Sequence, residues 1–369
     1  MKEGWEYKKL DEVCYVEYGT RVVQKKDGGT IYPVYGGGGE TFRMDRFNRS
    51  DSIVIARFAM SKQCTRFVKG KFFLNDSGLT IRSKVDKIAQ DFLNWHIIAL
   101  NDEIYLLGKG MAQKNLDMPS FRNITLKIPP LSEQQHIVEE LDLLSSIIEK
   151  KKAQLNELDN LAQSLFYEMF GDPITNEKGW QVKTLGKECT ELKYGTSKPA
   201  CENGKYKYLR MGNLTINGEL DLSSLKTIDI PDDEVEKCIV RYGDILFNRT
   251  NSLDLIGKTC MFNLEEPMVI AGYIIRVRLS KNLKPRYISA MFNLPRMKLL
   301  LKKMAKGAVN QANINSKELA SILVPIPPLD LQQQFATKIE AIEHQKELIK
   351  QSIKEVETLF NSRMDYYFN

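Results

Sequence analysis

Three short stretches contain residue types that could carry out chemistry. Gly257-Lys258-Thr259 resembles the end of a phosphate-binding loop, but that loop needs a glycine five positions earlier, where Ser252 stands. The acidic stretch 231–237 has no lysine two residues after Glu234, so we interpret it as a solvated turn rather than a nuclease site. The two Ile-Pro-Pro-Leu segments lack the polar and aromatic residues of a loop that methylates amino groups. We therefore expect a non-catalytic binding protein.

Histidine and cysteine usage predicts neither a metal site nor disulfides. The three histidines, His96, His136 and His344, lie far apart in the sequence, and the six cysteines show no CxxC spacing. The N-terminus does not read as a signal or transit peptide, and no apolar run is long enough to span a membrane. These features favour reduced thiols and a cytoplasmic location without membrane contact.

The remaining polar residues are of the kinds that bind DNA. Arginine can donate two hydrogen bonds to guanine or hold a phosphate, and planar amides can pair with the edge of adenine. Arg57 and Arg249 each end an apolar run, where a side chain leaves a strand for a loop; the alternative for each is a surface salt bridge. Our candidate DNA-binding residues are Thr20, Arg21, Lys25, Arg43, Arg57, Gln113, Lys114, Thr196, Lys198, Asn248, Arg249, Thr250, Asn251 and Gln311.

Most of these candidates lie in segments that occur twice. Gly4-Trp5 returns as Gly179-Trp180, and each copy continues into a Tyr-Gly-Thr turn, at residues 18–20 and 194–196. The runs 52–57 and 244–249 then correspond, followed by 78–82 and 272–276, by short helices near 91–101 and 285–305, and by the polar segments 109–116 and 306–314. Asn115 and Asn313 in these polar segments are better explained as caps of a turn. Short β-branched runs with one or two helices predict a small mixed α/β lobe in each copy.

Each copy ends in a Pro-Pro pair and a long helical pattern. Pro129-Pro130 and Pro327-Pro328 end an extended segment and prevent helix before them. Apolar residues then recur at steps of four and three from Ile137 to Met169, and again 198 positions later. Such spacing indicates two coiled-coil helices, and we expect them to pair antiparallel rather than each to pack on its own lobe. Lys151, Lys346 and Arg363 are polar positions in this seam.

The sequence therefore predicts an α+β protein with two mixed α/β domains in a pseudo-two-fold repeat, separated by two long antiparallel helices. We place the domains at residues 1–130 and 171–328 and the helical spacers at 131–170 and 329–369. The net charge of +6 is distributed unevenly over these segments. The two domains carry excesses of +6 and +7, whereas the spacers carry −5 and −2. Two basic domains suggest two contacts with a polyanion such as duplex DNA.

The duplicated motifs resemble those of the specificity subunit of type I restriction–modification systems. The resemblance covers essentially the whole chain and rests on the Gly-Trp openings, on Gly243-Asp-Ile-Leu-Phe-Asn-Arg-Thr250, and on the two Ile-Pro-Pro-Leu segments with their following Gln-Gln pairs. The first copy departs from the pattern, with Asp51-Ser-Ile-Val-Ile-Ala-Arg57 in place of the fuller strand motif.

This resemblance implies a target-recognition function. Each domain would read one half of a bipartite sequence in double-stranded DNA, and the helices would set the spacing and dock two methyltransferase (modification) subunits. Restriction subunits would join them. S-adenosylmethionine, ATP and Mg²⁺ would be bound by the partner subunits, with no cofactor and no catalytic residue in this chain. The alternative interpretation is a coiled-coil scaffold whose lobes bind protein.

Overall fold

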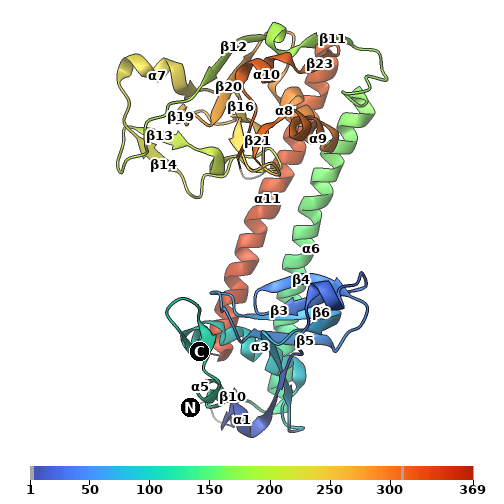
Figure 1. The fold of residues 1–369 in the computed structure, drawn as a ribbon, viewed down its shortest axis with the longest axis vertical. Coiled ribbons are helices and arrows are strands. Elements are labelled where there is room, and N and C mark those ends of the chain that lie inside the picture. The colour runs from blue at the N-terminus through green and yellow to red at the C-terminus, as the bar shows by residue number, and fades with distance from the viewer. Residues whose placement is uncertain (1–3, 309–310, 369) are drawn as a thin grey trace. The chain divides into compact units, whose positions relative to one another are not determined.

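The computed structural model describes residues 4–308 and 311–368 and divides into two compact units (Figure 1). Unit 1 contains Met1–Lys152 and Gln351–Asn369, and unit 2 contains Ala153–Lys350. Each unit is a β-rich lobe together with part of both long helices, α6 (Leu131–Phe170) and α11 (Leu329–Phe368). The predicted α+β class and the two long helices are confirmed. The division between the two units runs through both helices, and the predicted domain bounds stay a prediction.

Both long helices begin directly after a Pro-Pro pair. The carbonyl oxygen of Pro130 accepts from the backbone N–H of Gln134 at 3.0 Å, and that of Pro328 accepts from the N–H of Gln332 at 3.1 Å. A proline cannot donate the hydrogen bond that would extend the helix backward. The predicted helix starts are therefore confirmed by the same backbone bonds in each copy.

The two helices pair antiparallel within each unit. In unit 1, Glu140 of α6 accepts from Tyr367 of α11, while Lys152, further along α6, pairs at 2.8 Å with the earlier residue Glu357. Unit 2 has the same order. There the rings of Phe166 and Phe335 lie 5.6 Å apart, and Asp159 pairs with the later residue Lys346 at 2.5 Å. The predicted antiparallel pairing is thus present in both units.

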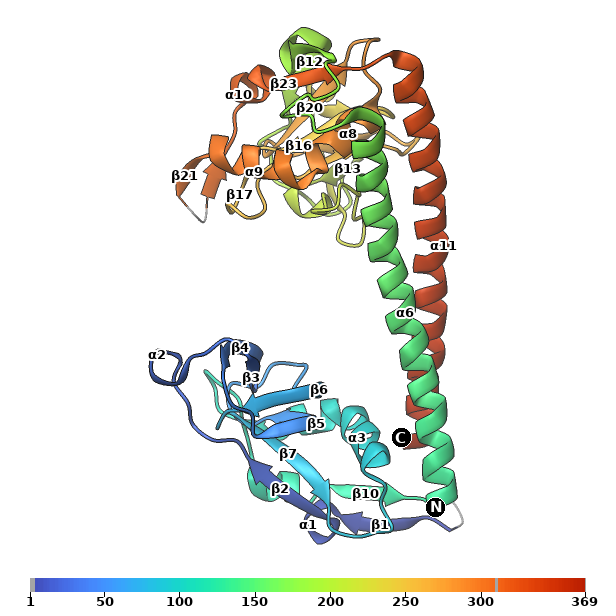
Figure 2. The ribbon, with the colours of Figure 1, turned by 90° about the vertical axis from the view of Figure 1, so that its right-hand side faces the viewer.

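The lobe of unit 1 is built on one six-stranded sheet in the order β2-β7-β5-β6-β3-β4. Helix α3 lies on this sheet, between it and α6 (Figure 2), and buries Phe92, Leu93 and Ile97 in the unit's main core. The elements of this lobe are β1 (Glu6–Lys9), α1 (Leu10–Val13), β2 (Cys14–Tyr18), α2 (Gln24–Asp27), β3 (Tyr32–Gly36), β4 (Gly39–Met44), β5 (Arg49–Ala56), β6 (Thr65–Leu74), β7 (Gly78–Ser83), α3 (Gln90–Ala99), α4 (Asn101–Leu106), β8 (Gly108–Lys109), β9 (Asn115–Leu116), α5 (Met118–Arg122) and β10 (Thr125–Ile128).

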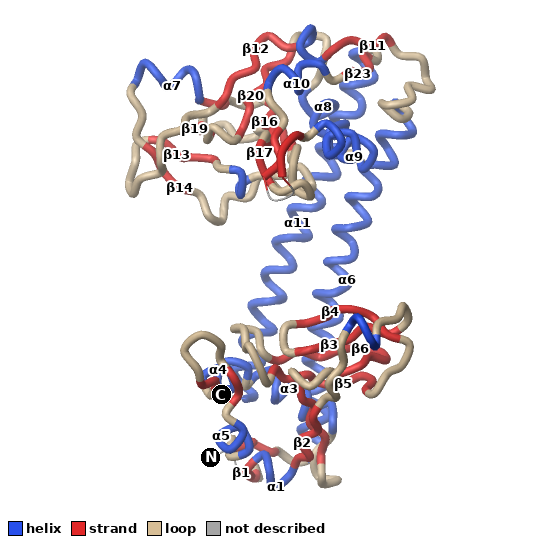
Figure 3. The backbone as a smooth tube through the Cα atoms, viewed as in Figure 1, coloured by secondary structure: helices blue, strands red, loops and turns tan. Residues whose placement is uncertain are grey.

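The lobe of unit 2 has two four-stranded sheets, β12-β20-β16-β18 and β14-β13-β19-β15, joined by long loops (Figure 3). Its elements are β11 (Gln181–Thr184), the 3₁₀ turn η1 (Leu185–Glu188), β12 (Cys189–Tyr194), β13 (Tyr206–Leu209), η2 (Met211–Asn213), β14 (Lys226–Ile228), α7 (Asp232–Cys238), β15 (Ile239–Val240), β16 (Ile245–Asn248), β17 (Thr250–Asn251), β18 (Thr259–Met261), β19 (Met268–Ile270), β20 (Ile274–Leu279), α8 (Pro285–Asn293), α9 (Pro295–Met304), β21 (Lys306–Ala308), β22 (Gln311–Asn313), α10 (Ser316–Ser321) and β23 (Leu323–Ile326). The helix expected near 285–305 is divided because Pro295 disfavours helical backbone at the preceding Leu294.

The repeat holds in three dimensions, with one correction. Strands β2, β7 and β5 pair as β12, β20 and β16 do, and β1·β10 corresponds to β11·β23. However, the N–H of Gly19 donates to Gly78 O, and that of Gly195 donates to Ile274 O, both at 3.1 Å. Gly78 therefore corresponds to Ile274, and the predicted match with Gly272 is wrong by two residues. Gly272 lies instead in the turn before β20.

Candidate nucleic-acid interface

Arg57 is held in place on both sides of its backbone in the lobe of unit 1. It follows β5, its N–H donates to Ser77 O at 2.8 Å, and its carbonyl accepts from the N–H of Leu116 at 2.9 Å. Its guanidinium carbon lies 4.8 Å from the centre of the Tyr18 ring and 4.6 Å from that of Phe58. Stacking on aromatic faces restrains the side chain and leaves the N–H groups at its edge available to donate.

Arg249 is placed in the same way in the lobe of unit 2. Its N–H donates to Tyr273 O, and its carbonyl accepts from Ile314 N–H, both at 2.9 Å. Its guanidinium carbon lies 4.8 Å from the centre of the Tyr194 ring, and the Tyr194 hydroxyl is held in turn by Ser316. The Arg249 Nε has no hydrogen-bond partner among the described residues. Tyr18 and Tyr194 were absent from our candidates, although the repeated Tyr-Gly-Thr sequence marked them.

The Tyr-Gly-Thr turns bring a threonine close to each arginine site. The N–H of Thr20 donates to Leu74 O at 3.0 Å, and that of Thr196 donates to Ile270 O at 2.9 Å. A Cβ atom on Gly19 would lie 1.8 Å from Asn75 O, so only glycine permits this close approach. The conserved geometry of the two turns therefore depends on their glycines, and it fixes each threonine relative to the neighbouring strand ends.

In the two polar segments, β8 pairs with β9 and β21 pairs with β22 beside the two arginines, and residues 309–310 lie outside the described part of the chain. Gln113 and Gln311 are exposed, while Lys114 is half-buried with its Nζ 4.1 Å from the centre of the Tyr105 ring. Gln311 lines a shallow hollow together with Arg249, Thr250, Tyr273, Lys306, Gly307 and Asn313. Asn115 Oδ1 accepts from the N–H of Ala59 at 3.2 Å, which ties this segment to the loop after β5. Asp117 and Asn315 cap the following helices α5 and α10, so the caps predicted at Asn115 and Asn313 are wrong by two residues. Arginine, amide and threonine groups are thus brought together in each lobe.

The other candidates have different surroundings. Arg21 and Lys25 are exposed near or on α2, and Arg43, on the neighbouring strand β4, donates to Ile31 O at 3.0 Å. Lys198 forms an ion pair with Glu234 at 3.1 Å.

Asn248 does not face solvent. It is fully buried, and its amide is used by Tyr273 O and the Asn251 side chain. Thr250 and Asn251 lie in β17, which pairs with β22. The structure therefore argues against Asn248 as a direct DNA contact and makes it a support for the strand end that carries Arg249.

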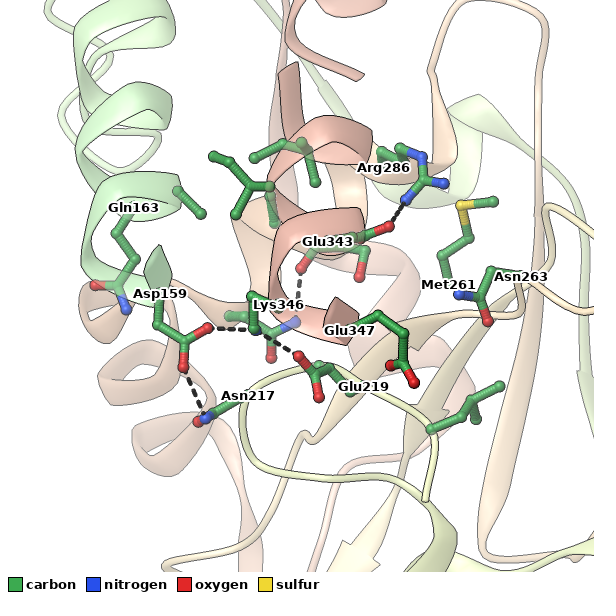
Figure 4. Close-up of a pocket in the computed structure, with 18 of the residues that line it drawn as sticks. Asp159, Gln163, Asn217, Glu219, Met261, Asn263, Arg286, Glu343, Lys346 and Glu347 are labelled. Carbon is green, nitrogen blue, oxygen red and sulfur yellow. Dashed lines mark hydrogen bonds and ion pairs between the residues drawn. The ribbon is translucent and has the colours of Figure 1, made fainter. Parts of the chain in front are cut away.

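A second cavity in unit 2 lies between the lobe and the helix pair (Figure 4). Lys346 projects into it and pairs with Asp159 at 2.5 Å and with Glu219. Burial lowers the pKa of Lys346, but the two carboxylates raise it above its usual value overall. Arg286 at the same cavity pairs with Glu340 and Glu343. Because carboxylates of the chain already hold both cations in ion pairs, we interpret the cavity as the attachment of the 216–220 loop to the helices.

The described residues form neither a metal site nor a membrane-spanning helix. Within residues 4–308 and 311–368, no group of three His, Cys, Asp or Glu side chains is arranged to hold a metal ion. Across the same residues, no helix is long and apolar enough to cross a membrane. All six cysteines are free thiols, and burial raises the pKa of Cys14, Cys189 and Cys260 to about 12.

The duplicated arginine sites and paired helices agree with a family match. Residues 2–160 and 177–358 match the model described as the type I restriction modification DNA specificity domain. The chain belongs to this family. It is 26% identical to the EcoKI specificity subunit of Escherichia coli K12 over 257 residues, which cover 65% of this chain and 55% of that subunit. It is 22% identical to the MjaVIII specificity subunit of Methanocaldococcus jannaschii, covering 78% of this chain and 73% of the relative.

A third relative and two solved structures are also similar to this chain. A putative MjaX specificity subunit of Methanocaldococcus jannaschii is 29% identical over 42% of this chain and 38% of the relative, so the chain spans about half the length of some relatives. The crystal structure of the S subunit of a type I restriction–modification system from M. genitalium aligns with a TM-score of 0.59 at 14% identity, covering 98% of this chain and 95% of that one. A structure from work on type I complex assembly and conformational transition gives 0.55 at 17% identity, covering 100% and 98%. At identities of 14% and 17%, the similarity to these two structures shows the fold of this chain and nothing more.

Proposed function

We propose that this chain is the DNA specificity subunit of a type I restriction–modification complex and that each lobe reads one half of a bipartite target. The observation that carries the proposal is the duplicated site in which Arg57 and Arg249 stack on Tyr18 and Tyr194. Two copies of one arrangement, each in a basic lobe, suit a ligand that presents two similar polyanionic surfaces.

The chemistry of the site fits direct and indirect contacts with duplex DNA. A guanidinium restrained on an aromatic ring has lost part of its rotational freedom before binding, which reduces the entropic cost of fixing it on a base edge or phosphate. Arginine binds guanine O6 and N7 through paired hydrogen bonds, and Gln113 or Gln311 offers an amide of the type that pairs with adenine. Thr20, Thr196 and the surrounding lysines suit phosphate contacts, which position the protein without reading sequence.

The helices and their partners complete the proposed mechanism. Two methyltransferase subunits would dock on this chain and bind S-adenosylmethionine, and restriction subunits would add ATP- and Mg²⁺-dependent steps, all in the cytoplasm. The antiparallel helices would fix the spacing of the two half-sites. A target adenine would be flipped into the partner's pocket, since a base inside the duplex cannot be reached. This chain would then contribute recognition and no catalytic group.

DNA binding by the complex of this chain with its methyltransferase subunits tests the proposal. We expect affinity to fall steeply between about 50 and 200 mM salt. Arg57→Ala and Arg249→Ala should each weaken binding of the target about 10- to 100-fold, the effect of losing one good base contact.

Arg82→Ala is the matched control for Arg57→Ala. Arg82 also stacks at 4.8 Å, on Tyr15, but at the opposite end of the β2–β7 strand pair. We expect this control to change affinity less than twofold. Salt-independent binding, or equal effects of all three variants, would instead favour the scaffold alternative, in which the lobes bind protein.

A further inference from the structure

A buried glutamine joins the first long helix to its lobe. Gln134, in the first turn of α6, has no exposed surface. Its Nε2 donates to Lys87 O at 2.7 Å and to Pro129 O at 2.8 Å, and its Oε1 accepts from the N–H of Ala89 at 2.9 Å. One side chain therefore connects the start of α6, the proline before it and the residue that precedes α3.

The second copy contains the same arrangement. Gln332, in the first turn of α11, is also fully buried. Its Nε2 donates to Asn282 O at 3.0 Å and to Pro327 O at 2.9 Å, and its Oε1 accepts from the N–H of Lys284 at 2.8 Å. The acceptor, the donor and the proline occupy equivalent positions in both lobes. We call these two sets of contacts the glutamine clamps.

Each clamp satisfies groups that would otherwise be unpaired. Ala89 and Lys284 are the N-cap residues of α3 and α8. The side chain of neither residue makes a capping hydrogen bond to its helix. Because the glutamine uses both N–H groups and its carbonyl, a change in the angle between α6 and α3 would break at least one buried hydrogen bond. The clamp thus resists rotation of the long helix at the point where it leaves the lobe.

A small rotation at that point has a large effect at the far end of the helix. Each long helix has 40 residues. At 1.5 Å per residue this is about 60 Å, so a rotation of about 5° moves the far end by about 5 Å. One step along duplex DNA is about 3.4 Å. The direction in which a helix leaves its lobe therefore matters at the scale of one base pair.

We propose that Gln134 and Gln332 are positioning residues that set the number of base pairs accepted between the two half-sites. This inference rests on the proposed function, in which the helices fix the spacing. The adjacent residues Gln135 and Gln333 provide matched controls, because they follow the clamp residues directly but are exposed.

The test uses the complex of the full chain with its methyltransferase subunits. Methyl transfer is measured on duplexes that carry the native half-sites with the native spacer, one base pair less and one base pair more. Gln134→Met and Gln332→Met keep the side-chain length but remove its hydrogen bonds. We expect each to reduce the preference for the native spacer at least tenfold while discrimination against a mutated half-site changes less than twofold. Gln135→Met and Gln333→Met should leave both unchanged.

The outcomes separate the inference from the function on which it rests. If the wild-type complex methylates all three spacers equally, the proposed spacing function is wrong. If the wild type discriminates and the clamp variants discriminate equally well, or lose half-site discrimination to the same degree, the inference about the clamps is wrong. Assembly and thermal melting are measured first. If a methionine variant does not assemble, the milder Gln134→Asn and Gln332→Asn decide by the same criteria.

Discussion

The two lobes share a frame and differ in the surface built on it. In unit 1, the ten-residue strand β6 joins β5 to β3 and β4, so six of the lobe's strands form one sheet. In unit 2, the counterpart of β6 is β18, which has only three residues and ends its sheet. Four further strands form a separate sheet. The contacts that persist are the arginine–tyrosine stack, the glycine turn and the glutamine clamp. We infer that the frame is constrained by its junction with the helices, while the remainder is free to vary with the DNA half-site.

The seam between the helices also differs between the units. Lys346 in unit 2 is buried between Asp159 and Glu219, whereas Ile148 occupies the equivalent position, 198 residues earlier, in unit 1. Asp159 also accepts from Asn217 at 3.2 Å. These polar contacts hold the 216–220 loop of unit 2 against the helix pair, and among the described residues only this copy of the position carries a charge.

Replacing Lys346 with the residue of the other copy should have the largest effect on stability. Lys346→Ile leaves the half-buried Asp159 carboxylate without its cation, while Glu219 keeps its ion pair with Lys350 at 2.6 Å. Because both carboxylates retain some solvent contact, we expect a loss of about 1–3 kcal/mol rather than the full cost of a buried unpaired charge. The loss is measured by urea denaturation of the wild type and the variant.

Lys338→Ile is the control for this substitution, since Lys338 is exposed on the same helix. It should change stability by less than about 0.5 kcal/mol. A Lys346→Ile protein as stable as wild type would show that the ion pairs of Lys346 add no more stability than apolar packing does. The difference between the two seams would then have no effect on stability.

A smaller effect is expected from a histidine found in one lobe only. His96 of α3 is buried and stacks on Phe368 at 4.9 Å, and Met291 of α8 holds the equivalent position in unit 2. Burial, with a contribution from the charge of Lys127, lowers the pKa of His96 from 6.5 to about 3. The unfolded chain therefore takes up a proton below about pH 6.5 that the folded chain excludes, so this stability is present above that pH and is lost as the pH falls.

His96→Met should remove this pH dependence from unit 1. At pH 5.5, one unit below the usual histidine pKa of 6.5, the wild type should have lost about 1.4 kcal/mol more than the variant, relative to pH 7.5. Paired denaturation curves at the two pH values measure the difference, and all other titrating groups cancel between the two proteins. Identical pH profiles would mean that His96 titrates alike in the folded and unfolded states, so that its burial does not lower its pKa.

The spacing of apolar residues was sufficient to predict the long helices and the repeated strands, because burial of one face of a helix or strand imposes a regular spacing on these residues. It was insufficient where contacts are made by side chains from distant segments. The predicted correspondence of Gly78 with Gly272 was wrong because sequence similarity between two strands does not show their hydrogen-bond register. Asn248 resembled an exposed amide, yet it is buried, because its side chain bonds Tyr273 O and the Asn251 amide, and the strand motif does not show these contacts. The paired glutamines were visible in the sequence, but their burial depends on carbonyl groups about 45 to 50 residues away.

The most direct test of the central claim is a map of methylated adenines in cells that carry the complete system with one lobe duplicated. Leu10 and Leu185 donate to Ile124 O and Ile322 O at 2.8 Å, so residues 10–124 can replace residues 185–322 at equivalent junctions. For the unaltered protein, we predict a motif of two specified halves separated by an unspecified gap. In the protein with duplicated lobe 1, one half should occur twice and the other should disappear. Retention of both original halves would contradict the claim that each lobe reads its own half of the target.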